Sequence, residues 1–174
     1  MKFKNKYREG KIKMIKLESI TVDNFEECLR LRVNDSQSKY IASNAYSLAE
    51  AYALTNHKLY KPITYAIYND NVMIGFIFVI YQPIDKDDLS DDEDVYYLAR
   101  IMIDYKYQGK GYGKKALDEL IKLLKTKLYG DAKAIVLSSN PNNQPAYSLF
   151  LSLGFKEMGI NDDDGDNLLR LELD

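Results

Sequence analysis

The chain has 174 residues, 46% of them hydrophobic, and a formal net charge of −2, which suits one globular domain with its own core. Its longest apolar run, residues 72–81, is far short of the roughly 18 residues that cross a membrane, and its start lacks an apolar signal segment; we expect a cytoplasmic protein without membrane contact. A single cysteine, Cys28, and a single histidine, His57, exclude an internal disulfide and a multi-cysteine zinc site, and we predict no bound metal.

Segment 1–13 differs in charge from the rest of the chain. Six basic residues and one acidic residue give it a net charge of +5, which leaves −7 for residues 14–174. An acidic body argues against nucleic acid as the partner, because binding phosphates requires a basic surface. We therefore predict a disordered basic appendage over 1–13 and a single domain over 14–174.

The spacing of apolar residues predicts the elements of the first half of the domain. Alternation with a period of two marks strands, and apolar residues three and four positions apart mark the inner faces of helices. In chain order we predict a strand over 15–20, a helix over 23–32 with Cys28 on its inner face, a helix that a capping box at Ser47 and Glu50 opens and that ends near His57, and a hairpin with strands over 63–68 and from Val72 onward.

The second half opens with an acidic loop over 83–94, which either attracts a cationic ligand or is an ordinary solvated loop. Strands and helices then alternate, and a hairpin closes the chain. The predicted elements are a strand over 95–103, an amphipathic helix with apolar residues from Ala116 to Leu128, a strand over 134–138, a helix over 145–153 and a hairpin around a tight turn at 161–167.

Three glycines, Gly109, Gly111 and Gly113, lie where the chain passes from the strand over 95–103 into the amphipathic helix. Glycine permits positive φ and lets a ligand come close to the backbone. The first N–H groups of a helix have no partner inside it, so a turn of this kind can bind phosphate oxygens. The spacing fits neither a Walker A loop nor the G-x-G-x-x-G fingerprint of a dinucleotide fold.

The segment Gln108-Gly109-Lys110-Gly111-Tyr112-Gly113 resembles the Q/R-x-x-G-x-G/A motif of the GCN5-related N-acetyltransferase (GNAT) superfamily. The resemblance extends over 14–173 and includes Asn143 to Ala146 and the Leu153-Gly154-Phe155 triplet. Within the superfamily, the chain is similar to small bacterial spermine/spermidine acetyltransferases. The resemblance implies one α/β domain of the α+β type, with a mixed, mostly antiparallel, splayed sheet and helices on both faces.

The resemblance also implies acetyl-CoA as the cosubstrate and a place for each part of it. In this family the fourth and fifth strands begin as parallel neighbours and then splay apart, and the pantetheine arm lies in the gap. By position, Ile101, Met102 and Ile103 would contact the arm, the turn residues Gly109, Lys110, Gly111, Tyr112, Gly113 and Lys114 would bind the pyrophosphate, Gln108 would shape that turn, and Asn143 would contact CoA.

The acid and base of the reaction are less clearly marked. Where the family often has a tyrosine that protonates the leaving thiolate, this chain has Phe150, and Tyr147 one helical turn earlier is the alternative acid. Related enzymes can use a carboxylate on the fourth strand as the base, whereas Leu98, Ala99 and Arg100 offer none. Asp104 follows this strand, the 85–94 loop is adjacent in sequence, and a chain of water could connect either to the amine, so we leave the base open.

The predicted function is acetyl transfer from acetyl-CoA to a primary amine by direct attack, with a polyamine such as spermidine or spermine as the acceptor. The alternatives are another small amine, a protein N-terminus, or a CoA-binding module without turnover. The expected partner is thus a small-molecule amine, with no nucleic acid and no membrane; monomer and homodimer both remain open.

Overall fold

The structure, a computed structural model, describes residues 14–87 and 93–174, so the predicted appendage 1–13 and residues 88–92 of the acidic loop lie outside the described residues. None of the helices in the described part of the chain has the length and hydropathy that a membrane crossing needs. The elements are β1 (Ile15–Ser19), α1 (Phe25–Arg30), the 3₁₀ helix η1 (Asp35–Gln37), α2 (Asn44–Leu54), β2 (Lys61–Asn69), β3 (Val72–Gln82), β4 (Val95–Ile103), α3 (Tyr112–Lys125), β5 (Ala134–Ser139), α4 (Gln144–Ser152), β6 (Lys156–Asn161) and β7 (Asn167–Glu172).

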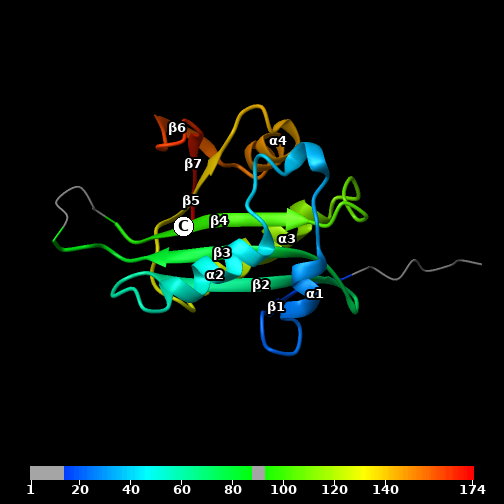
Figure 1. Ribbon diagram of the computed structural model, residues 1–174. Coiled ribbons are helices and arrows are strands. Elements are labelled where there is room, and N and C mark those ends of the chain that lie inside the picture. The colour runs from blue at the N-terminus through cyan, green and yellow to red at the C-terminus, as the bar shows by residue number, and fades with distance from the viewer. Residues whose placement is uncertain (1–13, 88–92) are drawn as a thin grey trace, which may run out of the picture.

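The strands form one seven-stranded sheet in the order β1-β2-β3-β4-β5-β7-β6, as Figure 1 shows. Every neighbouring pair is antiparallel except β4 and β5. These two are parallel and pair over only three positions, the last of which joins Tyr97 to Val136. Beyond that point, which we call the strand fork, β5 turns away and the rest of β4 has no strand partner on that edge (Figure 1). The predicted mixed, splayed sheet is confirmed.

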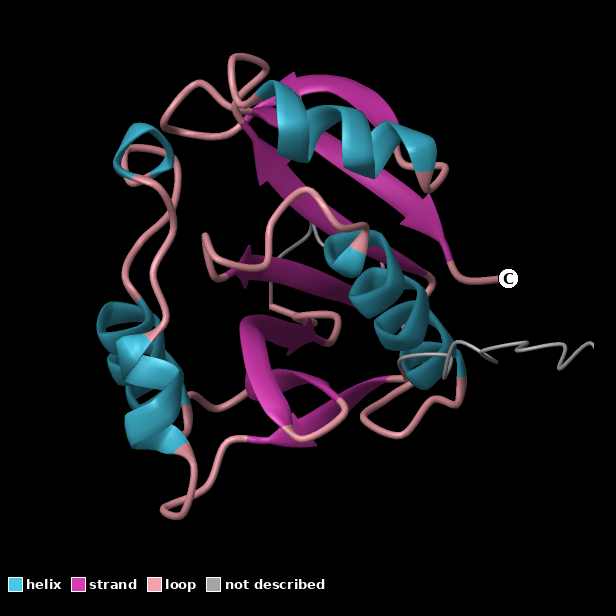
Figure 2. Ribbon diagram, turned by 90° about the vertical axis from the view of Figure 1, so that its right-hand side faces the viewer, coloured by secondary structure: helices cyan, strands magenta, loops and turns pink. Residues whose placement is uncertain are grey.

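Helices cover both faces of the sheet, and each face has its own core (Figure 2). Leu117 and Leu120 of α3 and Phe150 of α4 pack in one core, which we call the α3–α4 face. Cys28 of α1 and Ala51 of α2 belong to the other core, on the α1–α2 face. Burial of apolar side chains on both faces explains why β3, in the middle of the sheet, is hydrophobic nearly throughout.

The helix predicted to open at Ser47 in fact begins one turn earlier. Its N-cap is Ser43, whose hydroxyl accepts the N–H of Tyr46 at 3.2 Å. Ser47 lies inside α2, where it is buried and its hydroxyl donates to the Ser43 carbonyl at 3.0 Å. The prediction from the Ser47–Glu50 pattern is wrong because Ser43 also has a capping hydroxyl, and capping there lets the buried Asn44 donate to the Cys28 carbonyl at 2.8 Å.

Candidate active site

A pocket of about 1080 Å³ lies along the unpaired part of β4. One wall comes from the turn between β4 and α3 and from the start of α4. The other comes from the connection between α1 and α2, residues 33–42, and from the β6–β7 hairpin. The pocket therefore occupies the gap that the splayed strands open, and both faces of the sheet contribute to it.

Most residues predicted to bind the cosubstrate come together in this pocket. Its lining includes Ile101, Met102, Ile103, Gln108, Gly109, Gly111, Tyr112, Gly113, Lys114 and Asn143. Lys110 does not line it, because its ammonium donates to the Lys106 carbonyl at 3.1 Å and lies over the ring of Tyr107.

The glycine turn presents free backbone donors to the pocket. Gly109 and Gly111 have φ of 71° and 76°, a conformation that glycine adopts without strain. Gly111 is the N-cap of the 14-residue α3 and provides no side-chain cap. In the described part of the chain, the N–H groups of Gly111, Tyr112 and Gly113 have no backbone acceptor. Together with the positive end of the helix dipole, these donors make the turn suitable for a phosphate group.

Two side chains fix this turn against the α1–α2 connection. The carboxylate of Asp104, only 3% exposed, accepts the N–H of Arg32 at 2.9 Å and that of Lys106 at 3.1 Å. Gln108 donates to the Ile103 carbonyl and to Gln37 Oε1, both at 2.9 Å. These hydrogen bonds therefore connect the glycine turn directly to the opposite wall of the pocket. The sequence did not predict these contacts of Gln37 and Asp104.

A β-bulge in β4 changes the direction of the side chains beside the strand fork. Phe78 of β3 lies opposite Arg100 and Val79 lies opposite Leu98, so Ala99 is the extra residue. Before the bulge Leu98 packs in the α3–α4 core; after it Met102 packs in the α1–α2 core. The bulge thus inverts the alternation of the strand.

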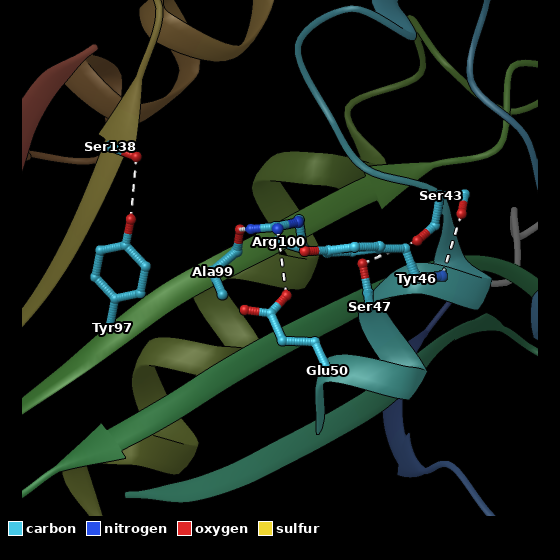
Figure 3. A network of polar contacts seen from close by, with 8 residues as sticks. All are labelled: Ser43, Tyr46, Ser47, Glu50, Tyr97, Ala99, Arg100 and Ser138. Atoms are coloured by element: carbon cyan, nitrogen blue, oxygen red, sulfur yellow. Dashed lines mark hydrogen bonds and ion pairs between the residues drawn. The ribbon is translucent and has the colours of Figure 1, made fainter. Parts of the chain in front are cut away.

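Ala99 and Arg100 both line the pocket at this bulge. Arg100 donates through Nη1 to the Ala99 carbonyl at 2.6 Å and through Nη2 to Glu50 of α2 at 3.3 Å (Figure 3). The hydroxyl of Tyr97, the last β4 residue paired with β5, lies 3.0 Å from that of Ser138, which follows the paired part of β5 (Figure 3). The sequence did not predict these contacts beside the pocket, which join the lining residues Arg100 and Ser138 to Glu50 and Tyr97.

Of the two aromatic residues at the candidate acid positions, Phe150 lies at the pocket and Tyr147 does not. Phe150 lines the pocket, with its ring edge-to-face against Phe155. Tyr147 does not line it; its hydroxyl donates to Glu157 of β6 and accepts from Asn167 of β7 at 2.8 Å. Burial, reinforced by the bond to Glu157, raises the pKa of the Tyr147 hydroxyl above its usual value.

The β6–β7 hairpin brings Asp162, Asp164 and Asp166 to the pocket. Asp162 accepts the N–H groups of the other two, and Asp166 accepts the side-chain N–H of Asn140 at 2.8 Å, which ties the hairpin to the end of β5. By contrast, residues 83–87, 93 and 94 of the predicted acidic loop do not line the pocket. The pocket's negative charge comes from the closing hairpin, which the sequence predicted only as a turn.

Residues 25–155 match the model of the acetyltransferase (GNAT) family. The chain is 34% identical over 160 residues to the spermine/spermidine N(1)-acetyltransferase of Bacillus subtilis (strain 168), covering 91% of this chain and 99% of that protein.

Solved structures with the same fold include two acetyltransferases. The spermidine N-acetyltransferase of Vibrio cholerae, in complex with CoA and spermine, has a TM-score of 0.62 and 15% identity, covering 91% of this chain and 95% of that chain. The aminoglycoside N(6′)-acetyltransferase of Legionella pneumophila has a TM-score of 0.66 and 13% identity, covering 91% and 92%. Because their acceptors differ at similar scores, the fold alone does not select an acceptor.

Proposed function

The chain belongs to the acetyltransferase (GNAT) family, and we propose that the acceptor of its acetyl group is a polyamine such as spermidine or spermine. The protein is an acetyl-CoA-dependent N-acetyltransferase. The observation that supports a polyamine acceptor is the similarity of this chain, over nearly the full length of both chains, to a Bacillus enzyme that acts on spermine and spermidine. The negative charge of the hairpin at the pocket supports the same choice.

For the cosubstrate, we propose that the free N–H groups of the glycine turn bind the pyrophosphate and that the unpaired edge of β4 binds the pantetheine arm. The first part uses the helix start at Gly111. The second uses the backbone groups of Ile101 to Ile103, which have no partner from β5. An arm that runs from the turn along β4 leads toward the strand fork, and the thioester would lie there, beside the bulge.

The chemistry proposed at the fork is direct attack of the amine on the thioester. The amine nitrogen forms a bond to the carbonyl carbon, the carbon–sulfur bond breaks, and CoA leaves as the thiol after gaining a proton. An acetyl-cysteine intermediate is not part of this route, because Cys28 is fully buried and does not line the pocket. Burial raises the pKa of its thiol to about 12, which leaves almost no thiolate near neutral pH.

For the acceptor, we propose that the hairpin carboxylates attract the ammonium groups that do not react. A polyamine has several such charges, whereas a simple monoamine has none to spare. A partly exposed charge pair contributes roughly 1 kcal/mol, about a fivefold effect on binding. Spermidine should therefore be acetylated with a higher kcat/KM than a monoamine of the same chain length.

We test this acceptor assignment with Asp164→Asn, using Asp163→Asn as the matched control because Asp163 lies in the same turn but does not line the pocket. Asp164→Asn should raise the KM for spermidine about threefold to tenfold and leave the KM for a monoamine unchanged. Initial rates of thiol release would measure both. Faster turnover of an aminoglycoside or of a peptide N-terminus than of any polyamine would refute the polyamine assignment.

A further inference from the structure

A protonated amine cannot attack a thioester, because its nitrogen has no free electron pair. The primary amines of polyamines have pKa values of about 10, so most are ammonium groups at pH 7 and must lose a proton at the fork. A carboxylate of the protein is the natural acceptor of that proton. Asp104 is occupied, since its two oxygens accept backbone N–H groups. The hairpin carboxylates lie beyond the end of β5, where Asp166 contacts Asn140.

Glu50 of α2 does not itself line the pocket, but its carboxylate contacts Arg100, which does, from the α1–α2 face. Its Oε2 lies 3.3 Å from Nη2 of Arg100, the residue that follows the bulge. Arg100 and its neighbour Ala99 line the pocket, and the Ala99 methyl group leaves the space beside the bulge open. The second oxygen of Glu50, Oε1, has no hydrogen bond among the described residues.

Two features of the Glu50–Arg100 ion pair favour replacement of the guanidinium by a substrate cation: its partial exposure and the second hydrogen bond of Arg100. The side chains are 34% and 24% exposed, so water screens the attraction and separating them costs little. Arg100 keeps a second anchor at the Ala99 carbonyl, 2.6 Å away, when Glu50 is taken.

We propose that Glu50 receives the reacting ammonium of the acceptor at the strand fork and takes the proton that this ammonium must lose. The proton passes from the ammonium to the carboxylate, which gives a neutral amine and a protonated Glu50. The amine attacks the carbonyl carbon, the carbon–sulfur bond breaks, the nitrogen passes its second proton to the departing thiolate, and the Glu50 proton returns to solvent. Arg100 is a positioning residue in this scheme. The inference rests on the proposed function, because it assumes a cationic amine acceptor.

The test compares Glu50→Gln with Glu26→Gln, a matched control on α1 whose carboxylate pairs with Arg30 in the exposed part of the same face. Glu50→Gln should lower kcat/KM for spermidine about tenfold at pH 7, below the usual general-base factor because solution still supplies some free amine. CoA affinity by calorimetry and Tm should match the wild type. Glu50→Asp, which keeps the carboxylate, should recover part of the activity.

A second acceptor separates a chemical role from a structural one. An analogue of spermidine with an aminooxy group at the reacting end is neutral there at pH 7, so Glu50→Gln should change its rate less than threefold. Equal losses with both acceptors, or no loss relative to Glu26→Gln, would overturn the inference. If the wild type acetylates other cationic amines but no polyamine, the polyamine assignment fails, and the same comparison with those amines decides Glu50.

Discussion

Gly111→Val should abolish most CoA binding while leaving the core of the protein intact. A side chain at Gly111 meets no protein atom within 4 Å, and because Gly111 lines the pocket, we expect this side chain to obstruct the approach of a phosphate. Valine also disfavours the φ of 76° that Gly111 adopts, so the backbone would move and the array of donors would be lost. Loss of two charge-assisted hydrogen bonds predicts at least ~10²-fold weaker binding.

Gly159→Val is the matched control for this prediction. Gly159 in β6 has φ of 75°, and a side chain there likewise meets no protein atom within 4 Å, but it does not line the pocket. Both variants carry the same backbone strain and should lower Tm by similar amounts. Calorimetric titration with CoA should then separate them, with only Gly111→Val losing affinity. Equal affinity for the two variants would show that the turn does not bind the cosubstrate.

Phe150→Tyr should raise turnover, by up to ~10²-fold where the chemical step limits the rate. Phe150 lines the pocket without a hydroxyl, and we propose that the thiolate departs without an acid at this position. A thiol with a pKa of about 8.5 can leave as the thiolate at neutral pH, so the wild type is expected to be active but slow. The turnover number at saturating acetyl-CoA and spermidine measures the gain.

Tyr147→Phe tests the alternative acid in the same assay. Because the hydroxyl bonds Glu157 and Asn167 outside the pocket, its removal should cost about 1 kcal/mol of stability and change turnover less than threefold. A fall of roughly 10²-fold with unchanged CoA affinity would instead identify Tyr147 as the acid that protonates the thiolate. No response to either substitution would point to a different rate-limiting step, such as product release.

Features with a local physical cause were predictable from the sequence. Glycine spacing predicted a turn with positive φ before α3, and Gly109 and Gly111 have it. The hydrophobic run over 95–103 predicted β4 with the bounds it has in the structure. The start of α2 was not predicted, because Ser43 and Ser47 carry the same capping group and only the buried contact of Asn44 separates them.

Contacts between residues far apart in the chain could not be predicted from the sequence. Glu50 and Arg100 are 50 positions apart, and Gln37 and Gln108 are 71 apart, so no periodicity links them. The bulge at Ala99 is equally hidden, because it depends on the register between β3 and β4. The family resemblance predicted residues that line the pocket, but the opposite wall depends on the packing of the α1–α2 connection and the closing hairpin onto the sheet.

We propose that the pocket at the strand fork transfers acetyl from acetyl-CoA to a primary amine of a polyamine. The most direct test is to incubate the protein with isotopically labelled acetyl-CoA and spermidine and to locate the label by NMR. We predict one acetyl group on a primary amine, formed in step with the released thiol and absent with Gly111→Val. Thiol release with the label recovered only as acetate, or on no polyamine nitrogen, would contradict the claim.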